Sequence, residues 1–361
     1  MIRSQERSAS FTSIQLITHY GSLGVGLLLV IVWGFRINGL LWGTFLTLIL
    51  PLPFLISQAT KGIAFRPQRF QFNDAIQMWE YAWPLTLGNV AMWGLRVSDL
   101  FIISSFRSER DVGLYSVSYN ISAKSIELLV ALFLLSVSPL VYRTWETEGK
   151  EATEKSVTMV TRVYLILCLP ATVGLTVLAF PFVALLTAPD YYEGSRIVGY
   201  VVFSSFVWGL ANIAVLGIAI KKQAHLLAGT QIIAAATHIG LQLLLVPRFG
   251  YIAAAISTLI GYTVLLVLQT LGSRSHLAWK FPFKTLRNTL IASSIMGLVA
   301  WGTYGLSGYE SGGKGSPFFL FLSIIIAIPV YLINIWFLGE VTLDEKMKIF
   351  QYWHKLMNKE A

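Results

Sequence analysis

The sequence has 361 residues, of which 55% are hydrophobic and only 12% are charged, and its mean hydropathy is +0.66. This composition excludes an ordinary soluble domain and predicts a membrane protein. The formal net charge of +9 is expected from the loops of such a protein, so we infer no nucleic-acid partner from it.

The apolar runs are continuous rather than alternating, which favours helices over the strands of a membrane barrel. About ten runs are each long enough to cross a hydrocarbon core of about 30 Å. We therefore predict an all-α fold, a polytopic transmembrane helical bundle of about ten helices. In chain order the expected spans are 14–33, 39–57, 83–106, 112–141, 157–180, 197–220, 226–246, 251–271, 289–306 and 317–338.

The basic residues are distributed unevenly over the loops that join these spans. If the N-terminus is cytoplasmic, 19 of the 27 Lys and Arg residues fall on the cytoplasmic side, with Arg162 near the start of the fifth span counted among them, while six fall on the opposite side and two deeper within spans. Positive charge is enriched in the cytoplasmic loops of membrane proteins. We therefore predict that both termini lie in the cytoplasm.

Two pairs of charged residues lie within the third and fourth spans, Arg96 with Asp99 and Lys124 with Glu127. Placing each charge at mid-span costs about 2.5–3.5 kcal/mol of insertion free energy. We therefore expect each charge either to be compensated by a partner or to serve a function. The members of each pair are three residues apart, so they can form local ion pairs that only help the helices insert. In the alternative interpretation they face a water-filled pathway, where Arg96 and Lys124 attract an anionic group. Asp99 and Glu127 would then bind sugar hydroxyls, a proton or a sodium ion.

Other motifs carry weaker signals. The five histidines have no spacing typical of metal ligands, so we expect no metal site and no cofactor. His238 alone lies within a span, where we expect a hydrogen bond between helices rather than a proton relay. Gly39 and Gly43 form a weak helix-packing motif. Residues 308–315 resemble a phosphate loop, but Gly315 replaces the required Ser or Thr. Because no soluble segment is long enough for a catalytic domain, we predict that the chain is not an enzyme.

The stretch "YAWPLTLGNVAMWGLRVSDLFIISSFRSERDVGLYSVSYNIS" carries a family resemblance, which "VPRFGYIAAAISTLIGY" continues. The features are a proline entering a helix, an aspartate late in it and a Val-Gly-x-Tyr-Ser start to the next helix. Here these residues are Pro84, Asp99, Val112, Gly113, Tyr115 and Ser116. In them the chain resembles the second, MATE-like lobe of the polysaccharide-exporting flippases in the multidrug, oligosaccharidyl-lipid and polysaccharide exporter superfamily. Gln242 stands where this family commonly has Asn.

Aligned on this family, the helices resemble the fifth to fourteenth of a fourteen-helix member. The resemblance implies that the first four helices are missing, so that the chain is a fragment or acts with a first lobe from elsewhere. The expected division is two spans of the N-terminal lobe in 1–60, a basic cytoplasmic linker in 61–80, a six-helix lobe in 81–272, two further spans in 273–338 and a cytoplasmic tail in 339–361.

The resemblance also implies a function. The family moves an oligosaccharide on undecaprenyl pyrophosphate from the cytoplasmic to the outer leaflet of the bacterial inner membrane, for O-antigen, lipopolysaccharide or exopolysaccharide synthesis. Arg96 would help to neutralise the pyrophosphate, and Asp99 would hold Arg96 in place or contact sugar.

The implied partners are the lipid-linked oligosaccharide, membrane lipids, a polysaccharide polymerase, glycosyltransferases and a coupling ion, H+ or Na+. Two alternatives stay open. One is a cation-coupled multidrug exporter of the same superfamily, and the other is a scaffold or inactive fragment that transports nothing.

Overall fold

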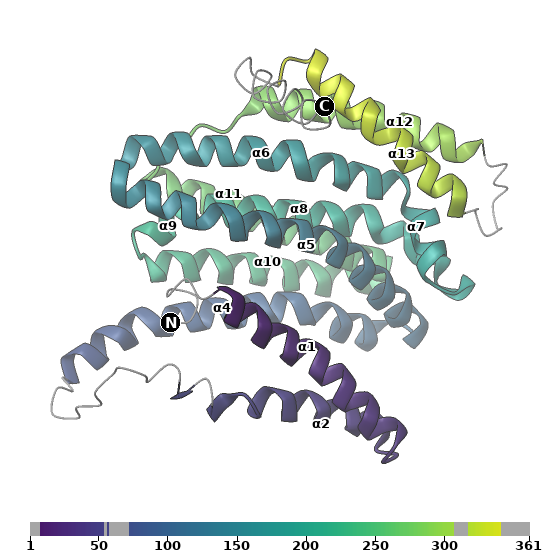
Figure 1. Ribbon diagram of the computed structural model, residues 1–361, viewed down its shortest axis with the longest axis horizontal. Helices are drawn as coiled ribbons and strands as arrows, with labels where there is room; N and C mark the ends of the chain where they lie inside the picture. The colour runs from purple at the N-terminus through teal and green to yellow at the C-terminus, as the bar shows by residue number, and fades with distance from the viewer. Residues whose placement is uncertain (1–7, 54–55, 58–71, 307–316, 341–361) are drawn as a thin grey trace, which may run out of the picture. The chain divides into compact units, whose positions relative to one another are not determined.

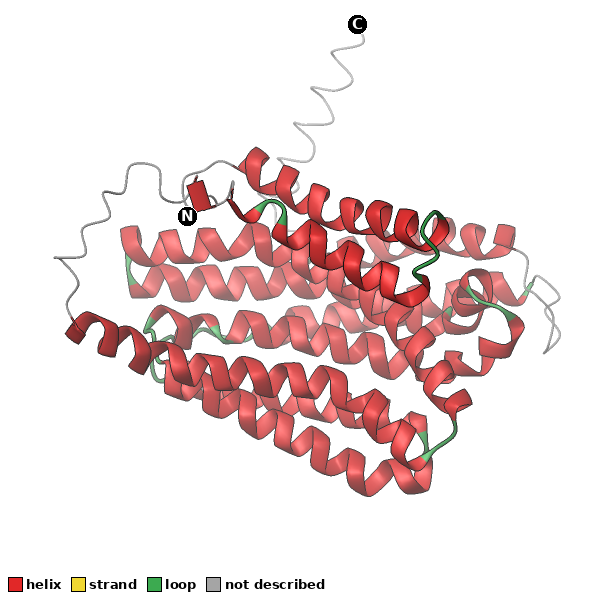
Figure 2. Cartoon of the chain, turned by 90° about the horizontal axis from the view of Figure 1, so that it is seen from below, coloured by secondary structure: helices red, strands yellow, loops and turns green. Residues whose placement is uncertain are grey.

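The computed structural model describes residues 8–53, 56–57, 72–306 and 317–340, and the structural statements below refer to these residues. Their regular structure is helical throughout, without strands (Figure 1, Figure 2). The predicted all-α bundle is confirmed, and each expected span overlaps a helix, although the spans over 39–57 and 197–220 are interrupted. Six helical segments are long and apolar enough to cross a membrane: Glu109–Glu148, Lys150–Val177, Pro189–Ile220, Ala224–Phe249, Tyr251–Arg274 and Pro317–Phe337.

The chain divides into two compact units, residues 1–75 and 76–361. In the first unit, α1 (Ser8–Ile31) and α2 (Arg36–Ile49) form a helical hairpin. A Cβ atom added to Gly43 would lie 2.5 Å from the backbone of Gly26 in the facing helix. The lack of a side chain at this position lets the two backbones approach closely, which is how small residues promote helix packing in membranes.

The helix predicted over residues 39–57 is interrupted. Helix α2 ends at Ile49, and a turn follows at Leu50 and Pro51. Pro51 has no backbone N–H to donate to the carbonyl oxygen one turn earlier, and its ring crowds that turn. The prediction of one continuous span over 39–57 is therefore wrong, since the prolines after residue 50 break it.

The second unit is a larger bundle that begins within α4 (Phe72–Phe106). The elements that follow are α5 (Glu109–Glu148), α6 (Lys150–Val177), α7 (Ala179–Leu186), the 3-10 helix η2 (Pro189–Ile197), α8 (Val198–Ala214), α9 (Leu216–Ile220), α10 (Ala224–Phe249), α11 (Tyr251–Arg274), α12 (Phe283–Gly305) and α13 (Pro317–Phe337).

The segment expected as one span over 197–220 is divided at Val215 into α8 and α9. Segments 81–272 and 273–338 belong to one compact unit, and the finer domain division stays a prediction.

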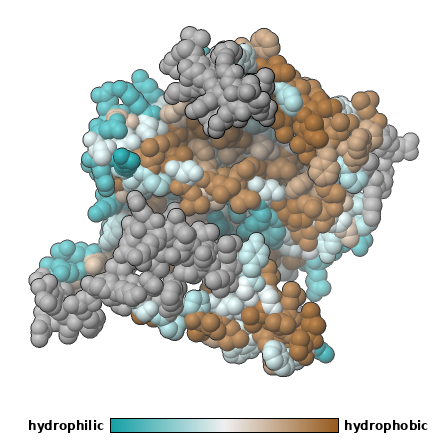
Figure 3. All heavy atoms as spheres, in the orientation of Figure 1, coloured by the Kyte–Doolittle hydropathy of each residue, from teal (hydrophilic) through white to brown (hydrophobic). Residues whose placement is uncertain are grey.

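Helix α8 packs against α5, α6 and α11, while α11 also packs against α10, and α12 packs against α6 and α13 (Figure 1). The core between α5, α6 and α8 consists of apolar side chains such as Ile126, Leu165 and Val202. Large apolar residues also cover much of the visible outer face of this unit in Figure 3, as expected where helices meet lipid. Hydrophilic residues gather at the left end, near the turn that joins α5 to α6.

The turns expected outside the cytoplasm lie together at one end of the second unit. Arg107 donates hydrogen bonds to the carbonyl oxygens of Val246 at 3.2 Å and Pro247 at 3.0 Å. Arg110 forms a 3.4 Å ion pair with Glu193. These contacts join the turn after α4, the segment before α8 and the turn after α10.

The turns expected in the cytoplasm lie together as well. A ring nitrogen of His276 lies 2.9 Å from the side-chain oxygen of Gln223, and the Ala278 amide donates to Glu154 at 2.9 Å. The described turns thus gather at two ends of this unit, in the alternating order expected of successive spans. Which end faces the cytoplasm stays a prediction.

Glu340, just beyond α13, anchors the end of this last helix. Its carboxylate accepts hydrogen bonds from the Thr285 hydroxyl and the Asn288 amide of α12, both at 2.8 Å. Arg162 of α6 lies 3.6 Å from the same carboxylate and donates to the Glu340 carbonyl oxygen. The cluster ties α13 to two neighbours. Most of the predicted 61–80 linker, the phosphate-loop-like stretch and nearly all of the 339–361 tail lie outside the described residues.

Candidate functional site

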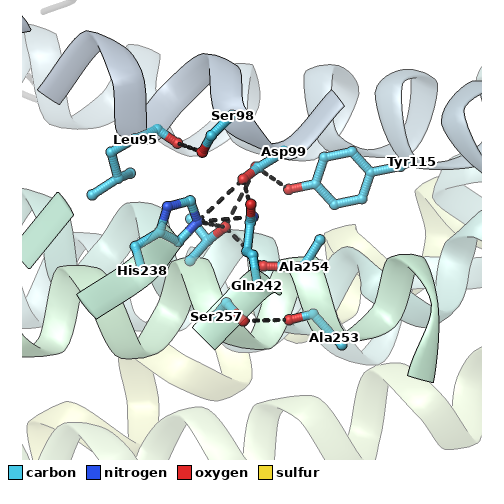
Figure 4. Close-up of polar contacts among 10 residues, drawn as sticks. Leu95, Ser98, Asp99, Tyr115, His238, Gln242, Ala253, Ala254 and Ser257 are labelled. Atoms are coloured by element: carbon cyan, nitrogen blue, oxygen red, sulfur yellow. Dashed lines mark hydrogen bonds and ion pairs between the residues drawn. The ribbon is translucent and has the colours of Figure 1, made fainter. Parts of the chain in front are cut away.

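Asp99 lies near the end of α4, and its side chain points into the bundle rather than outward (Figure 4). It is only 2% exposed. The Tyr115 hydroxyl of α5 donates to one carboxylate oxygen, and the Gln242 amide of α10 donates to the other. The Thr258 hydroxyl of α11 lies 3.5 Å from Oδ2. Three helices thus supply donors to this carboxylate.

His238 completes the group, which we call the Asp99 cluster: Asp99, Tyr115, His238, Gln242 and Thr258. The fully buried imidazole places Nε2 3.1 Å from Asp99 Oδ1 and 3.2 Å from Thr258 Oγ1. Nε2 also lies 3.0 Å from Gln242 Nε2, since residues 238 and 242 share one face of α10. Two buried atoms of the cluster, His238 Nδ1 and Gln242 Oε1, have no hydrogen-bond partner among the described residues.

Small residues make room for the imidazole between α10 and α11. A Cβ atom added to Gly261 of α11 would lie 2.9 Å from the Cβ of His238. Ala234 and Ala235 of α10 and Ala254 of α11 are buried in the same region. Because these residues are small, the two helices approach closely enough for side chains on both to reach Asp99.

Arg96 lies one turn before Asp99 but is exposed. Its guanidinium carbon lies 5.1 Å from the centre of the Trp208 ring, in a cation–π contact with α8. The local ion pair considered for Arg96 and Asp99 is absent from those formed by described residues, so the role of Asp99 in holding Arg96 is not supported. The physical reason is that Asp99 is turned toward donors on three other helices, while the longer Arg96 side chain reaches Trp208 of α8.

The second predicted pair is formed. Lys124 Nζ lies 3.6 Å from Glu127 Oε2 on α5. The Lys124 side chain is 74% exposed, and that of Glu127 is 21% exposed. Arg96 of α4 and Glu127 of α5 both interact electrostatically with Tyr119 of α5 and Tyr262 of α11, so the two charges lie near the same pair of tyrosines.

The four predicted site residues therefore form two environments. Arg96 and Lys124 present cationic groups on the surface of the bundle, where they can attract an anion. Asp99 instead belongs to a buried, hydrogen-bonded cluster.

Sequence reasoning missed most of the cluster. It predicted a hydrogen bond from His238 to a neighbouring helix, which the contact with Thr258 of α11 confirms, but it did not connect His238 with Asp99 and treated Gln242 only as a departure from a family pattern. Their spacing of four on one helix was a signal that they share a face. Tyr115 and Thr258 carried no such signal, because their proximity to Asp99 exists only after α5 and α11 pack against α4 and α10.

Comparison with known proteins agrees with this architecture. The family described as "Polysaccharide biosynthesis protein" matches residues 2–196, more than half of the chain. The chain is 20% identical over 336 residues to the probable low-salt glycan biosynthesis flippase Agl15 of Haloferax volcanii, covering 92% of this chain and 68% of that protein.

The fold is similar to that of the lipid II flippase MurJ in its inward closed conformation. The TM-score is 0.65 at 19% sequence identity, over 88% of this chain and 65% of the MurJ chain. This chain thus spans about two thirds of the length of either protein. The fold likeness agrees with the all-α bundle predicted from the sequence, and the family match shows that the chain belongs to the polysaccharide biosynthesis protein family.

Proposed function

We propose that this protein is a flippase that moves a lipid-linked saccharide across a membrane. Membership of a polysaccharide biosynthesis family supports this proposal, as does similarity to Agl15, a probable low-salt glycan biosynthesis flippase, and to MurJ, a lipid II flippase. Transport of a finished glycan requires no bond to be made or broken, so we propose a transporter and not an enzyme.

The observation that carries the proposal is the exposure of two cationic side chains within long helices, Arg96 in α4 and Lys124 in α5. A cationic side chain facing hydrocarbon is costly, so an exposed one within a span is expected to face water or an anionic ligand. The guanidinium of Arg96 is suited to phosphate because it presents several donors in a planar fork. Lys124 adds a second positive charge on the adjacent helix.

We propose an oligosaccharide on undecaprenyl pyrophosphate as the substrate, with the diphosphate near Arg96 and Lys124. A bacterial inner membrane location and a role in O-antigen or exopolysaccharide synthesis would follow. A polymerase and glycosyltransferases would then be the proteins that use and supply the substrate. These finer assignments rest on the sequence resemblance.

The test is to delete the native gene and measure lipid-linked saccharide on each face of the membrane. Trapping on the cytoplasmic face, relieved by expression of this 361-residue chain, is the expected result. Sensitivity to cationic drugs is measured in the same strains. Increased drug sensitivity without trapped precursor would contradict the flippase proposal and favour a multidrug exporter.

A further inference from the structure

A groove lies between the start of α6 and the segment that joins α11 to α12. Its volume is about 530 Å³, which lies within the range of about 300–1,000 Å³ that is common for ligand sites. One wall is a stripe of α6 that runs from Glu151 to Arg162, and the other consists of Ala278, Trp279 and Lys280. None of the groove residues belongs to the Asp99 cluster or to the two cations proposed to bind the substrate.

The groove crosses the level at which α6 enters the membrane. The apolar part of this helix is expected to begin at residue 157, so Glu151 lies before it and Arg162 lies inside it. The 11 residues from Glu151 to Arg162 extend for about 16 Å along a helix. Since the head-group layer of one leaflet is about 5–8 Å thick, the groove is long enough to reach from water through this layer to hydrocarbon.

The segment between α11 and α12 supplies positive charge at this level. Residues 274–287 contain four basic residues and no acidic residue: Arg274, Lys280, Lys284 and Arg287. Lys280 is exposed, and none of the ion pairs among described residues includes it. An anion at the groove therefore meets a cation whose charge no described carboxylate compensates.

The two carboxylates in the groove already have partners. Glu154 accepts a hydrogen bond from the Ala278 amide at 2.9 Å and lies 3.9 Å from the Lys150 ammonium group. This bond holds the connecting segment against α6. Glu151 forms a 2.9 Å ion pair with Lys155. Three cationic and two acidic residues line the groove, so its net charge is +1.

Apolar side chains accompany these charges. The Trp279 ring is partly buried against the core, and its centre lies 6.1 Å from that of Phe281, which in turn lies 4.9 Å from that of Phe283. Phe283 is 73% exposed and Met159 is 44% exposed. Tryptophan beside lysine is typical of the membrane–water interface. A soluble anion would leave the apolar side chains in water, whereas an amphiphile with an anionic head group covers them.

We propose that this groove binds an anionic phospholipid, with the phosphate at Lys280 and the acyl chains along Met159 toward the apolar part of α6. Basic pockets between transmembrane helices are suited to such head groups. Because α12 packs against α6, a lipid that bridges α6 and the segment before α12 strengthens this attachment. The inference requires no transport activity, so it stands or falls separately from the proposed function.

Binding is tested on the purified full chain by native mass spectrometry, with phosphatidylglycerol as the anionic probe and phosphatidylcholine as the zwitterionic one. We expect the protein to retain phosphatidylglycerol preferentially. Lys280→Gln is expected to weaken this binding by about fivefold, the effect typical of one cation at an anionic lipid surface. Arg143→Gln is the matched control, since it removes one positive charge at an exposed position of α5 outside the groove, and it is expected to change nothing.

A second variant is expected to act in the opposite direction. Glu151→Gln removes a negative charge and releases Lys155 from its ion pair, so it should tighten the binding of phosphatidylglycerol. Glu148→Gln, which makes the same change of charge at the exposed end of α5, is the control. Partial unfolding of the variant would weaken binding, so it cannot produce the expected gain.

The position of the lipid is tested with phosphatidylglycerol that carries a photoreactive head group. We expect crosslinked peptides that contain residues 151–162 or 278–280. Crosslinks found only elsewhere would overturn the site, as would equal retention of the two lipids or equal effects of Lys280→Gln and Arg143→Gln. Displacement of the lipid by an equal concentration of glycerol phosphate would show a site for soluble anions and overturn the lipid assignment.

Size-exclusion chromatography checks that each variant is folded. If Lys280→Gln does not fold, the gain in Glu151→Gln and the crosslinked peptides decide the outcome. Absence of both would then overturn the proposal.

Discussion

At the scale of single residues, Asp99 and Arg96 illustrate how two charges one turn apart on a helix acquire different roles. The carboxylate of Asp99 is short and reaches donors from α5, α10 and α11 inside the bundle. The guanidinium of Arg96 has a longer stem and extends to Trp208. Asp99 is therefore held in a buried, hydrogen-bonded cluster, whereas Arg96 is exposed and can contact a ligand.

The hydroxyl of Tyr115 is expected to stabilise the fold, because it donates to a buried carboxylate. We predict that Tyr115→Phe lowers the stability by about 1–2 kcal/mol, measured as a lower unfolding temperature in detergent. Tyr119→Phe is the control, since that ring stacks on Tyr115 but its hydroxyl bonds no described residue. Equal effects of the two substitutions would contradict this explanation.

The charge and the planar shape of Arg96 are both expected to matter for transport. We predict that Arg96→Gln abolishes saccharide flipping in the gene-deletion strain while the protein still inserts and accumulates. Arg96→Lys should recover part of the activity, because lysine restores the charge but not the forked donors. Arg143→Gln, an exposed change near the end of α5, is expected to have no effect. Unchanged flipping in Arg96→Gln would refute the role.

At the scale of helices, close packing depends on particular glycines. A Cβ atom at Gly209 of α8 would lie 2.0 Å from the Tyr164 hydroxyl of α6, which donates to the Phe206 carbonyl oxygen at 2.8 Å. We predict that Gly209→Ala destabilises the protein by about 1–3 kcal/mol, because the ring must move from a buried site.

Gly229 of α10 is the matched control, since nothing lies within 4 Å of an added Cβ there. Gly229→Ala should be neutral or stabilising, because alanine favours a helix more than glycine does. Thermal unfolding of both variants checks the prediction, and similar melting temperatures would show that the contact at Gly209 does not limit packing.

The end of α13 depends on Glu340. We predict that Glu340→Ala costs about 3 kcal/mol, because Thr285, Asn288 and Arg162 would lose a buried acceptor. Limited proteolysis should then cleave near the end of α13 sooner than in the native protein. Glu148→Ala, at the exposed end of α5, serves as the control. If Glu340→Ala and Glu148→Ala are cleaved at the same rate, Glu340 does not anchor the end of α13.

At the scale of the whole molecule, the basic loops predict the orientation in the membrane. We predict that a cysteine replacing Lys221 reacts with a membrane-impermeant maleimide only from the cytoplasmic side, and one replacing Arg248 only from the opposite side. Cys168 is buried and is expected to stay unlabelled. Labelling of both positions from the same side would overturn the predicted topology.

The amino-acid sequence by itself determined the helical class, the approximate positions of the spans and the alternation of loops. These features depend on local properties, because each span must satisfy its own backbone hydrogen bonds in lipid and each loop carries its own charges. The Lys124 and Glu127 pair was predictable for the same reason, since both partners lie on one turn of helix.

Only the tertiary structure decided the partners of Asp99. The spacing of three residues allowed an ion pair between Asp99 and Arg96. It gave no information on Tyr115, Gln242 and Thr258, the donors that lie 16, 143 and 159 residues away in the sequence. Those donors reach Asp99 because α5, α10 and α11 lie around the end of α4, and small residues let α10 and α11 approach each other closely. A buried carboxylate accepts hydrogen bonds from donors that lie next to it in the interior. These donors come together only in the folded bundle.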